Sequence, residues 1–545
     1  MKKIFIIMFI LFGIIFISGC IEEAPVHVHE FDQEIESEEY LASPATCNGY
    51  AMYYYSCVCG EKCEDVFESE TKGEHDYVYH QIGEVGHVEY YECSVCHKKI
   101  YPELPRIDIT TDTEIAEEYC TAKISVSRCL EEYELSEISA QVKVRGNGSA
   151  EYNKKPFRIK FDKKQVMLGL NDNLKAKSWV LINEYNDRSR MRNFSAYYIS
   201  NYLFNHDGYY STDMRFVEVY LNGEYNGLYL LCEQQQINKG RVNINEAAEG
   251  YTGTDIGYFF ELDTYYYKEL VEETFAIDYK YGLKYTNGKT CSKSKFQNHY
   301  TIKSDIYSTE QNVFLRDTVE NIFFILYDTL NNNHSNGYYT LNDDFELVID
   351  KSITSQKEAV ERVLDLRSYI DMFIIQDIAQ NVDIGWSSFY FAFDASSTGS
   401  HKLIFEAPWD FDWAMGSSYA FKEGHFCVDQ DTSGRDTTLK DYVNPWMLLF
   451  ANTDWFYDEV AARWRQLKET TAFNDLYEAI DVLTNKYSSS FAKEFALWPD
   501  SLTKTLDRSK GIPEYLNNKT HYSSAMYLKE YIQSFEEYFD SLWLD

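Results

Sequence analysis

Three aspartates at the ends of predicted elements stand out in the stretch NVDIGWSSFYFAFDASSTGSHKLIFEAPWDFDWAMG, which begins at residue 381. Asp383 follows a predicted helix, whereas Asp410 and Asp412 follow a predicted strand. Carboxylates in such positions can bind a divalent cation through hard oxygen ligands, or can accept a proton from a hydroxyl group. They can also serve only as turn and capping residues, so the stretch alone leaves both interpretations open.

A helix, a loop and a hairpin must position these aspartates. Residues 365–381 predict a helix, because Asp365 is a suitable N-cap and apolar residues recur on one face. SSFYFAFD alternates as a strand, ASSTGS suits a turn, and KLIFEAPWD returns as a second strand. This order resembles the catalytic half of a protein kinase, in which one aspartate accepts the proton of the substrate hydroxyl and another binds Mg²⁺.

Basic residues that could hold phosphates lie in the N-terminal half of the chain. In the predicted strand 157–161 the apolar residues share one face, so Arg158 and Lys160 share the other. The strand follows the glycine-containing loop of VRGNGS, and a lysine beside such a loop suits a nucleotide phosphate site. Glu233, which follows a strongly apolar strand, could orient this lysine.

Further segments predict the frame of a mixed α and β protein. Residues 215–234 predict a hairpin that turns at Asn222 and Gly223. The other predicted strands lie within 138–162, 178–183 and 257–262, and the other predicted helices are 188–204, 455–470, 474–498 and 524–543.

Four long motifs occur in one order along the chain: VRGNGSAEYNKKPFRIKFD, SWVLINEYNDRSRMRNFSAYYIS, FVEVYLNGEYNGLYLLCEQ and APWDFDWAMG. Together they resemble the successive motifs of the CotH (spore coat protein H) kinase family, over roughly residues 138–417. The resemblance implies an α+β, atypical protein-kinase-like fold with a β-rich N-lobe, a mixed C-lobe and a helical C-terminal tail. It also implies binding of ATP and of Mg²⁺ or Mn²⁺, with phosphate transfer to serine or threonine of secreted or surface proteins.

The resemblance implies roles for single residues. Asp383 would be the catalytic aspartate, Asp410 the principal metal ligand and Asp412 its support. Arg192 belongs to the family signature YND…RN, which leaves open whether it is structural or faces a phosphate. The residues expected to bind the nucleotide are Lys160, its rival Lys155, Arg145, Asn147, Ser149, Glu233 and Arg192.

Ser388 departs from the family pattern. Kinases and the spore-coat members carry an asparagine five residues after the catalytic aspartate, where it helps to bind the metal, and this chain has Ser388 there. A hydroxyl is a weaker ligand than an amide oxygen. Either metal binding shifts to Asp410 and Asp412, or activity is lost.

A second function class therefore stays open, that of a catalytically inactive kinase-like module that binds a surface protein or a polysaccharide. Aromatic residues make up 17% of the chain and would suit stacking against sugars. The net charge of −36 argues against nucleic acid as a partner, because it repels phosphate backbones.

A small module rich in cysteine and histidine precedes these motifs, over residues 47–104. It contains a rough repeat in which a predicted strand runs into a thiol-bearing turn, as in a zinc ribbon. Cys57, Cys59, Cys93 and Cys96 predict one four-thiolate zinc site. The possible substitute ligands are Cys47, Cys63, His75, His80, His87 and His97. Disulfides stay open as the alternative, here and between Cys120 and Cys129.

The first twenty residues, MKKIFIIMFILFGIIFISGC, predict a bacterial lipoprotein signal with lipid on Cys20. The alternative is an uncleaved membrane anchor, and both place the chain outside the cytoplasm at the cell membrane. The predicted organisation is a signal peptide 1–19, an acidic tether 20–46, the module 47–104, a CotH kinase-like domain 105–420 and a helical region 421–545.

Overall fold

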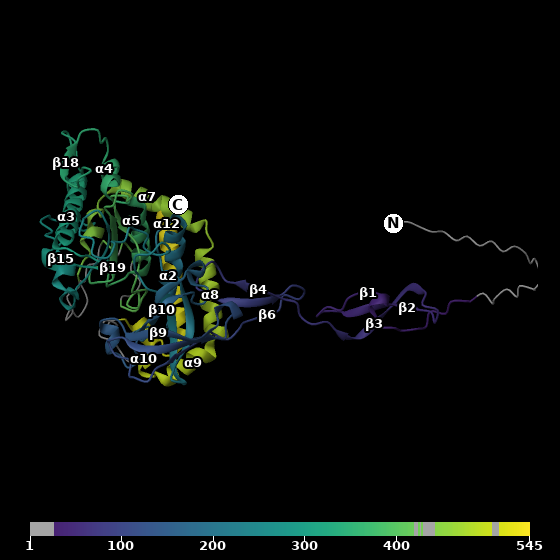
Figure 1. Cartoon of the computed structure of the whole chain (residues 1–545). Coiled ribbons are helices and arrows are strands. Elements are labelled where there is room, and N and C mark those ends of the chain that lie inside the picture. Colours follow the sequence, from purple (N-terminus) through teal and green to yellow (C-terminus); the bar gives the residue numbers. More distant parts are fainter. Residues whose placement is uncertain (1–26, 419–422, 426, 429–441, 504–511, 545) are drawn as a thin grey trace, which may run out of the picture. The chain divides into compact units, whose positions relative to one another are not determined.

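The computed structural model describes residues 27–544 except 419–422, 426, 429–441 and 504–511 (Figure 1). The chain divides into two compact units, one of residues 1–79 with 91–100 and one of residues 80–90 with 101–545. The predicted signal peptide and Cys20 lie outside the described residues. No helix within the described ranges is long and apolar enough to span a membrane.

The N-terminal unit is built mainly from strands and has few buried apolar residues. One three-stranded sheet has the order β1-β2-β3 and lies wholly in this unit. A second sheet along the chain has the order β4-β5-β6, and residues 80–81 and 89–90 of its strands belong to the larger unit. The strands are β1 (Leu41–Ser43), β2 (Tyr50–Ser56), β3 (Lys62–Lys72), β4 (Tyr77–Gln81), β5 (Glu89–Cys93) and β6 (Lys99–Ile100).

The first half of the larger unit contains a closed barrel of seven strands, in the order β10-β11-β13-β12-β7-β8-β9. Neighbours pair antiparallel except β7 and β12, which pair in parallel. Phe157, Ile159 and Phe161 point into the barrel core, as their alternation predicts. The strands are β7 (Arg106–Thr110), β8 (Cys120–Ser127), β9 (Leu135–Val144), β10 (Phe157–Gln165), β11 (Ala176–Ile182), β12 (Met214–Leu221) and β13 (Glu224–Glu233).

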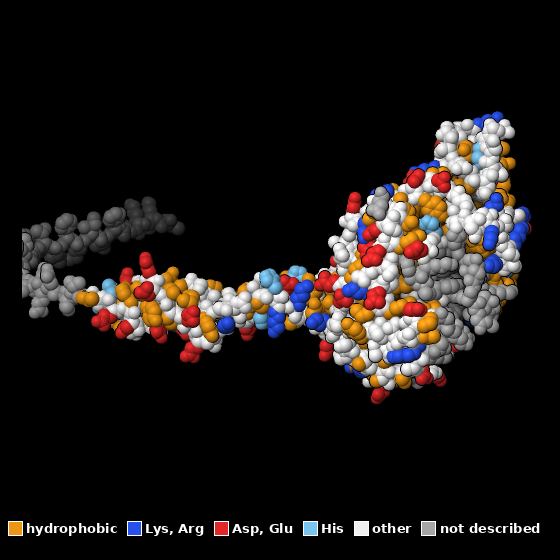
Figure 2. All heavy atoms as spheres, turned by 180° about the vertical axis from the view of Figure 1, so that it is seen from behind, with side chains coloured by type: hydrophobic (Ala, Val, Ile, Leu, Met, Phe, Trp, Pro, Cys, Tyr) orange, Lys and Arg blue, Asp and Glu red, His pale blue; other side chains and the backbone are white. Residues whose placement is uncertain are grey.

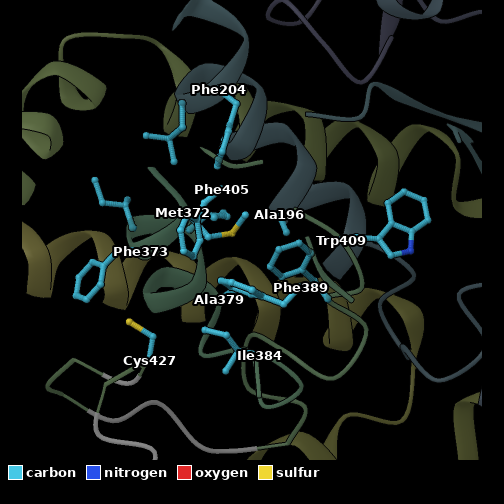
Figure 3. Close-up of a cluster of buried hydrophobic side chains, with 14 of the residues drawn as sticks. Ala196, Phe204, Met372, Phe373, Ala379, Ile384, Phe389, Phe405, Trp409 and Cys427 are labelled. Atoms are coloured by element: carbon cyan, nitrogen blue, oxygen red, sulfur yellow. The ribbon is translucent and has the colours of Figure 1, made fainter. Parts of the chain in front are cut away.

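A five-stranded sheet in the order β15-β16-β14-β19-β20 carries the second half of the larger unit. Its strands are β14 (Gly257–Leu262), β15 (Thr274–Ala276), β16 (His299–Ile302), β19 (Phe389–Asp394) and β20 (Leu403–Phe405). A separate hairpin joins β17 (Tyr338–Leu341) and β18 (Leu347–Asp350). Helix α5 (Leu366–Ala379) packs against β20 and against α2 (Arg192–Phe204), and Figure 3 shows the aromatic and aliphatic side chains between them.

Helices complete this unit. After α1 (Leu170–Asn173) and α2, they are α3 (Thr309–Asn331), α4 (Gln356–Val363), α5, α6 (Pro445–Leu449), α7 (Asp454–Lys468), α8 (Ala472–Lys486), α9 (Ser488–Leu497), α10 (Asp500–Thr503), α11 (Pro513–Asn517) and α12 (His521–Trp543). Apolar side chains from α7, α8 and α12 belong to the same core as those of α5. The described helices after residue 421 are therefore part of this unit rather than a separate body.

The structure confirms the mixed α and β class and the helical C-terminal region. The expected β-rich N-lobe takes the form of a barrel, because seven strands of the larger unit close on themselves. Closure depends on the parallel pair of β7 and β12, which are more than one hundred residues apart, so no local pattern could reveal it. On the face that Figure 2 shows, acidic side chains are scattered over both units rather than collected in one patch.

Candidate nucleotide and metal site

Two loops bring the predicted aspartates together. The first follows α5, whose N-cap is Asp365 as predicted, and carries Asp383. The second follows β20 and carries Asp410 and Asp412. Asn381 joins the loops, because its Nδ2 donates to the backbone oxygen of Asp410 at 3.2 Å.

The electrostatics of the loops show that these carboxylates lie near one another. Burial and the negative charge of Asp383 raise the pKa of Asp410. Burial, Asp410 and Asp383 together raise the pKa of Asp412 well above its usual value. Negative charges that repel in this way are stabilised by a bound cation. Ser388 lies in the same group, since its hydroxyl donates to Asp410 Oδ2 at 3.3 Å.

Asn186 supplies a further oxygen that sequence reasoning did not assign to the metal. Its Nδ2 donates to Asp412 Oδ2 at 3.2 Å, and the side chain is 7% exposed. Its Oδ1 is buried and has no hydrogen-bond donor among the residues that the structure describes. An unpartnered amide oxygen beside two carboxylates is a hard ligand set, so the residues present fit a divalent cation.

The backbone at this site is strained. Ser388, Ala407 and Asp410 have positive φ angles of 61°, 57° and 68°. Each left-handed residue other than glycine costs of order 1–3 kcal/mol, so the surrounding packing must hold all three. Such strain is typical of sites where side chains must point in one fixed direction.

Arg192 binds the backbone of the loop that carries Asp410 and Asp412, which is called the metal loop from here on. Its guanidinium is fully buried, pairs with Asp187 and donates through Nε to the backbone oxygen of Ala414 at 2.9 Å. Asn193, next in the same signature, accepts a hydrogen bond from the backbone N–H of Phe411 at 2.7 Å. These contacts favour the structural alternative for Arg192 over a contact with a phosphate.

The lysines and the glutamate expected at the phosphates have other environments. Lys160 is exposed, and its Nζ lies 5.8 Å from the ring centre of Tyr119. Lys155 donates to the backbone oxygen of Ala150 at 2.8 Å. Glu233 pairs with the guanidinium of Arg241, at 2.9 Å between Oε1 and Nε, and not with Lys160.

Arg145 and Arg158 are better placed than Lys160 to bind phosphate oxygens. The positive charge of Arg145 opposes the rise in the pKa of Asp410, and its guanidinium lies 5.6 Å from the ring of Trp409 in the metal loop. Burial and the charges of Arg145 and Arg241 lower the pKa of Arg158. Its Nε is buried and has no acceptor within the described part of the chain. Arg145 thus lies near Asp410, and Arg158 lies near Arg145, so the two guanidinium groups suit phosphate oxygens.

The loop between β9 and β10 contains the other predicted nucleotide residues. Gly146 has a φ angle of 89°, and a Cβ there would lie 2.3 Å from the hydroxyl of Ser149. Asn147 is exposed and accepts a hydrogen bond from Lys268 at 3.2 Å. The tight turn thus brings Ser149 against the loop backbone beside Arg145, which follows β9.

Lys303 is a residue near the site that sequence reasoning missed. Its Nζ lies 3.1 Å from Glu261 Oε2 and 3.7 Å from Asp263 Oδ2. Burial alone would lower its pKa, but these two carboxylates raise it. Glu261 in turn accepts the backbone N–H of Ser388 at 2.7 Å. In the sequence, Lys303 is marked only as the lysine of YTIKSD, a segment to which no chemistry was assigned.

The four cysteines predicted to share one zinc ion are not brought together. The Cys/His side chains form two groups, namely His27, His29, Cys57 and Cys59, and Cys47, His75, Cys93 and Cys96. The pair Cys57 and Cys59 follows β2, whereas Cys93 ends β5 in the other sheet and Cys96 follows that strand. Of the other substitutes, His87 instead pairs with Asp213 at 2.7 Å. Cys120 and Cys129 are both free thiols, so the structure does not show the disulfide considered between them.

Comparison with known proteins identifies the family of the chain. A search of curated proteins gave no match. The profile of the family described as CotH kinase protein matches residues 142–538. The match extends past the metal loop to α12, in agreement with the core that α5, α7, α8 and α12 share. The chain therefore belongs to the CotH kinase protein family.

Proposed function

We propose that the chain is an ATP- and divalent-metal-dependent protein kinase that transfers phosphate to serine or threonine of secreted or surface proteins. The observation that carries the proposal is the convergence of Asp383, Asp410 and Asp412 beside the unpartnered oxygen of Asn186. Family membership supports kinase-like chemistry, and the net charge of −36 argues against a nucleic-acid substrate.

Each residue has a role in this proposal. Asp410, Asp412 and Asn186 would hold Mg²⁺ or Mn²⁺, which when bound neutralises charge on the phosphates. Arg145 and Arg158 would orient the phosphate oxygens of ATP. Asp383 would accept the hydroxyl proton of the protein substrate. We further propose that lipid on Cys20 anchors the chain at the outer face of the membrane, so the substrates would be proteins that reach this location.

A phosphorylation assay tests the kinase. Purified protein is incubated with labelled ATP, Mg²⁺ or Mn²⁺ and a generic protein acceptor, and transfer to itself and to the acceptor is measured. We expect Asp410→Ala to abolish transfer, whereas Asp344→Ala, an exposed aspartate in the turn between β17 and β18, should not change it. Transfer that persists in Asp410→Ala would overturn the site assignment.

One observation favours a second candidate, a kinase-like module that binds a surface protein or polysaccharide without turnover. The Ser388 hydroxyl donates a hydrogen bond to Asp410, and an asparagine would offer an amide oxygen to the metal at this position. Thermal unfolding with ATP and Mn²⁺ separates the candidates further. A kinase should be stabilised by the pair and should transfer phosphate, whereas a module without a nucleotide site should show neither effect.

A further inference from the structure

The N-terminal unit contains two groups of metal-ligating side chains in place of the single predicted one. The first group consists of His27, His29, Cys57 and Cys59, and the second of Cys47, His75, Cys93 and Cys96. Each offers two sulfurs and two imidazole nitrogens, all within 4.8 Å of one another. We propose that this unit binds two structural zinc ions, one in each group.

The first group has the separations of a tetrahedral site. His27 Nε2 lies 3.0 Å from Cys57 Sγ, and His29 Nδ1 lies 3.3 Å from Cys59 Sγ. Zinc bonds of about 2.0–2.3 Å at tetrahedral angles place neighbouring ligands ~3.3–3.8 Å apart. These two pairs thus need to move by only tenths of an ångström, and all four ligand atoms already lie within 4.8 Å of one another.

The second group has matching geometry. Cys47 Sγ lies 3.6 Å from Cys93 Sγ, and His75 Nδ1 lies 3.3 Å from Cys96 Sγ. The sulfur–sulfur separation suits two thiolates on one ion and is far longer than the roughly 2.05 Å of a disulfide. Two thiolates and two neutral imidazoles also balance the charge of one Zn²⁺ in each group.

Both cysteine pairs lie in tight turns that hold their sulfurs on one side. In the first, the N–H of Gly60 donates to the backbone oxygen of Cys57 at 2.8 Å, and Gly60 has a φ angle of 92°. In the second, the N–H of His97 donates to the backbone oxygen of Cys93 at 2.9 Å, and His97 has a φ angle of 59°. The left-handed residue after each pair reverses the chain.

The apolar core of the unit is too small to hold it together. Its described residues that are buried and apolar are Tyr40, Ala51, Cys57, Phe67 and Cys93. Two of these five are proposed ligands, so little apolar burial is left to offset the entropy of folding. A structural zinc site contributes folding free energy directly, so it can offset the entropy that this small core does not.

Metal analysis of the full-length protein tests the proposal. We expect two zinc ions per chain, and one after either Cys57→Ser with Cys59→Ser or Cys93→Ser with Cys96→Ser. Cys63→Ser is the matched control, because Cys63 lies in the same unit but in neither group, and it should retain two. Cobalt titration of the metal-free protein should reach the tetrahedral absorption of mixed sulfur and nitrogen ligation at two equivalents.

The wild-type stoichiometry keeps the test decisive if a variant fails to fold. One ion per chain, lost in both double variants, would overturn the proposal in favour of a shared four-thiolate site. No ion together with loss of free thiols would overturn it in favour of disulfides. Loss of an ion in Cys63→Ser would show that the ligand sets are wrong.

Discussion

The amide of Asn186 gives the sharpest test of the metal site. Replacement by leucine, which has a similar size, removes the free Oδ1 and the hydrogen bond to Asp412 at 3.2 Å. Loss of a residue that orients or completes a metal site typically costs about 10–100-fold in affinity. At 1.36 kcal/mol for each factor of ten, this is ~1.4–2.7 kcal/mol. We therefore expect Asn186→Leu to need about 10–100-fold more Mn²⁺ for half-maximal effect.

Asn186→Asp should act in the opposite direction. A carboxylate at this position adds a negative charge beside Asp410 and Asp412, so it should lower the Mn²⁺ concentration needed. The same charge should lower the stability of the metal-free protein, because it increases the repulsion that already raises the pKa of both aspartates. A residue that only packs the loop would not produce these opposed effects.

Thermal unfolding at a series of Mn²⁺ concentrations measures the affinity without requiring turnover. The Mn²⁺ dependence of phosphate transfer gives an independent value. Asn485→Leu, an exposed asparagine on α8, is the control and should change neither. If both Asn186 variants shift the unfolding temperature but leave the Mn²⁺ dependence unchanged, Asn186 is not a ligand and the reasoning fails.

Four further results are expected. Ser388→Asn should strengthen Mn²⁺ binding, because asparagine offers an amide oxygen and tolerates the φ angle of 61° at this position. Arg158→Ala should raise the KM for ATP by about 10-fold or more, since a hydrogen bond to a charged group contributes about 1.5–3 kcal/mol, whereas Lys160→Ala should change it little. Metal-free protein should lose stability as pH rises from about 5 to about 8, because burial raises the pKa of Glu184 to about 8 and the folded state therefore holds its proton more tightly than the unfolded state. Glu494→Gln should destabilise the protein by about 3–5 kcal/mol in urea unfolding, because Glu494 is the counter-charge of two fully buried cations.

Each of these results has a control or an outcome that would contradict it. Ser388→Asn should bind Mn²⁺ more tightly than the wild type while its unfolding without metal is unchanged, and a gain in metal-free stability instead would contradict the ligand role. If the KM for ATP rises equally in Arg158→Ala and Lys160→Ala, the lysine also contributes to phosphate binding and the preference for Arg158 is wrong. Stability that rises with pH in the absence of metal would show that the acidic residues are already neutralised by protein groups. Glu530→Gln, an exposed glutamate on α12, should leave unfolding unchanged.

Local signals in the sequence predicted the cap of α5 and the turn between β12 and β13, but not helix α3 or the break between α8 and α9. Asp365 caps α5 as expected, and its side chain accepts the backbone N–H of Ser368. Asn222 and Gly223 both have positive φ angles in the turn between β12 and β13, as a tight hairpin turn requires. Such features depend on residues that are neighbours in the chain, so their physical causes can be read from short windows.

Pairings between distant segments could not be predicted in the same way. The spacing of Glu233 and Lys160 gave no indication that Arg241 would pair with the glutamate. Lys303 became relevant only because β14 and β16 are neighbours, which places its ammonium group beside Glu261. Charge pairs form between whichever side chains the tertiary fold brings together, and one sequence does not contain that information explicitly.

The ligands of the two Cys/His groups alternate along the chain, and this order matters while the chain is being made. Cys47, which belongs to the second group, is synthesised before Cys57 and Cys59 of the first. Its partners Cys93 and Cys96 follow only after Cys63. A nascent chain that has emerged as far as Cys63 thus carries Cys47 and Cys63 beside one complete ligand set, that of the first group. Early capture of an ion by His27, His29, Cys57 and Cys59 would withdraw two thiols from oxidation and leave Cys47 available for the turn that emerges last.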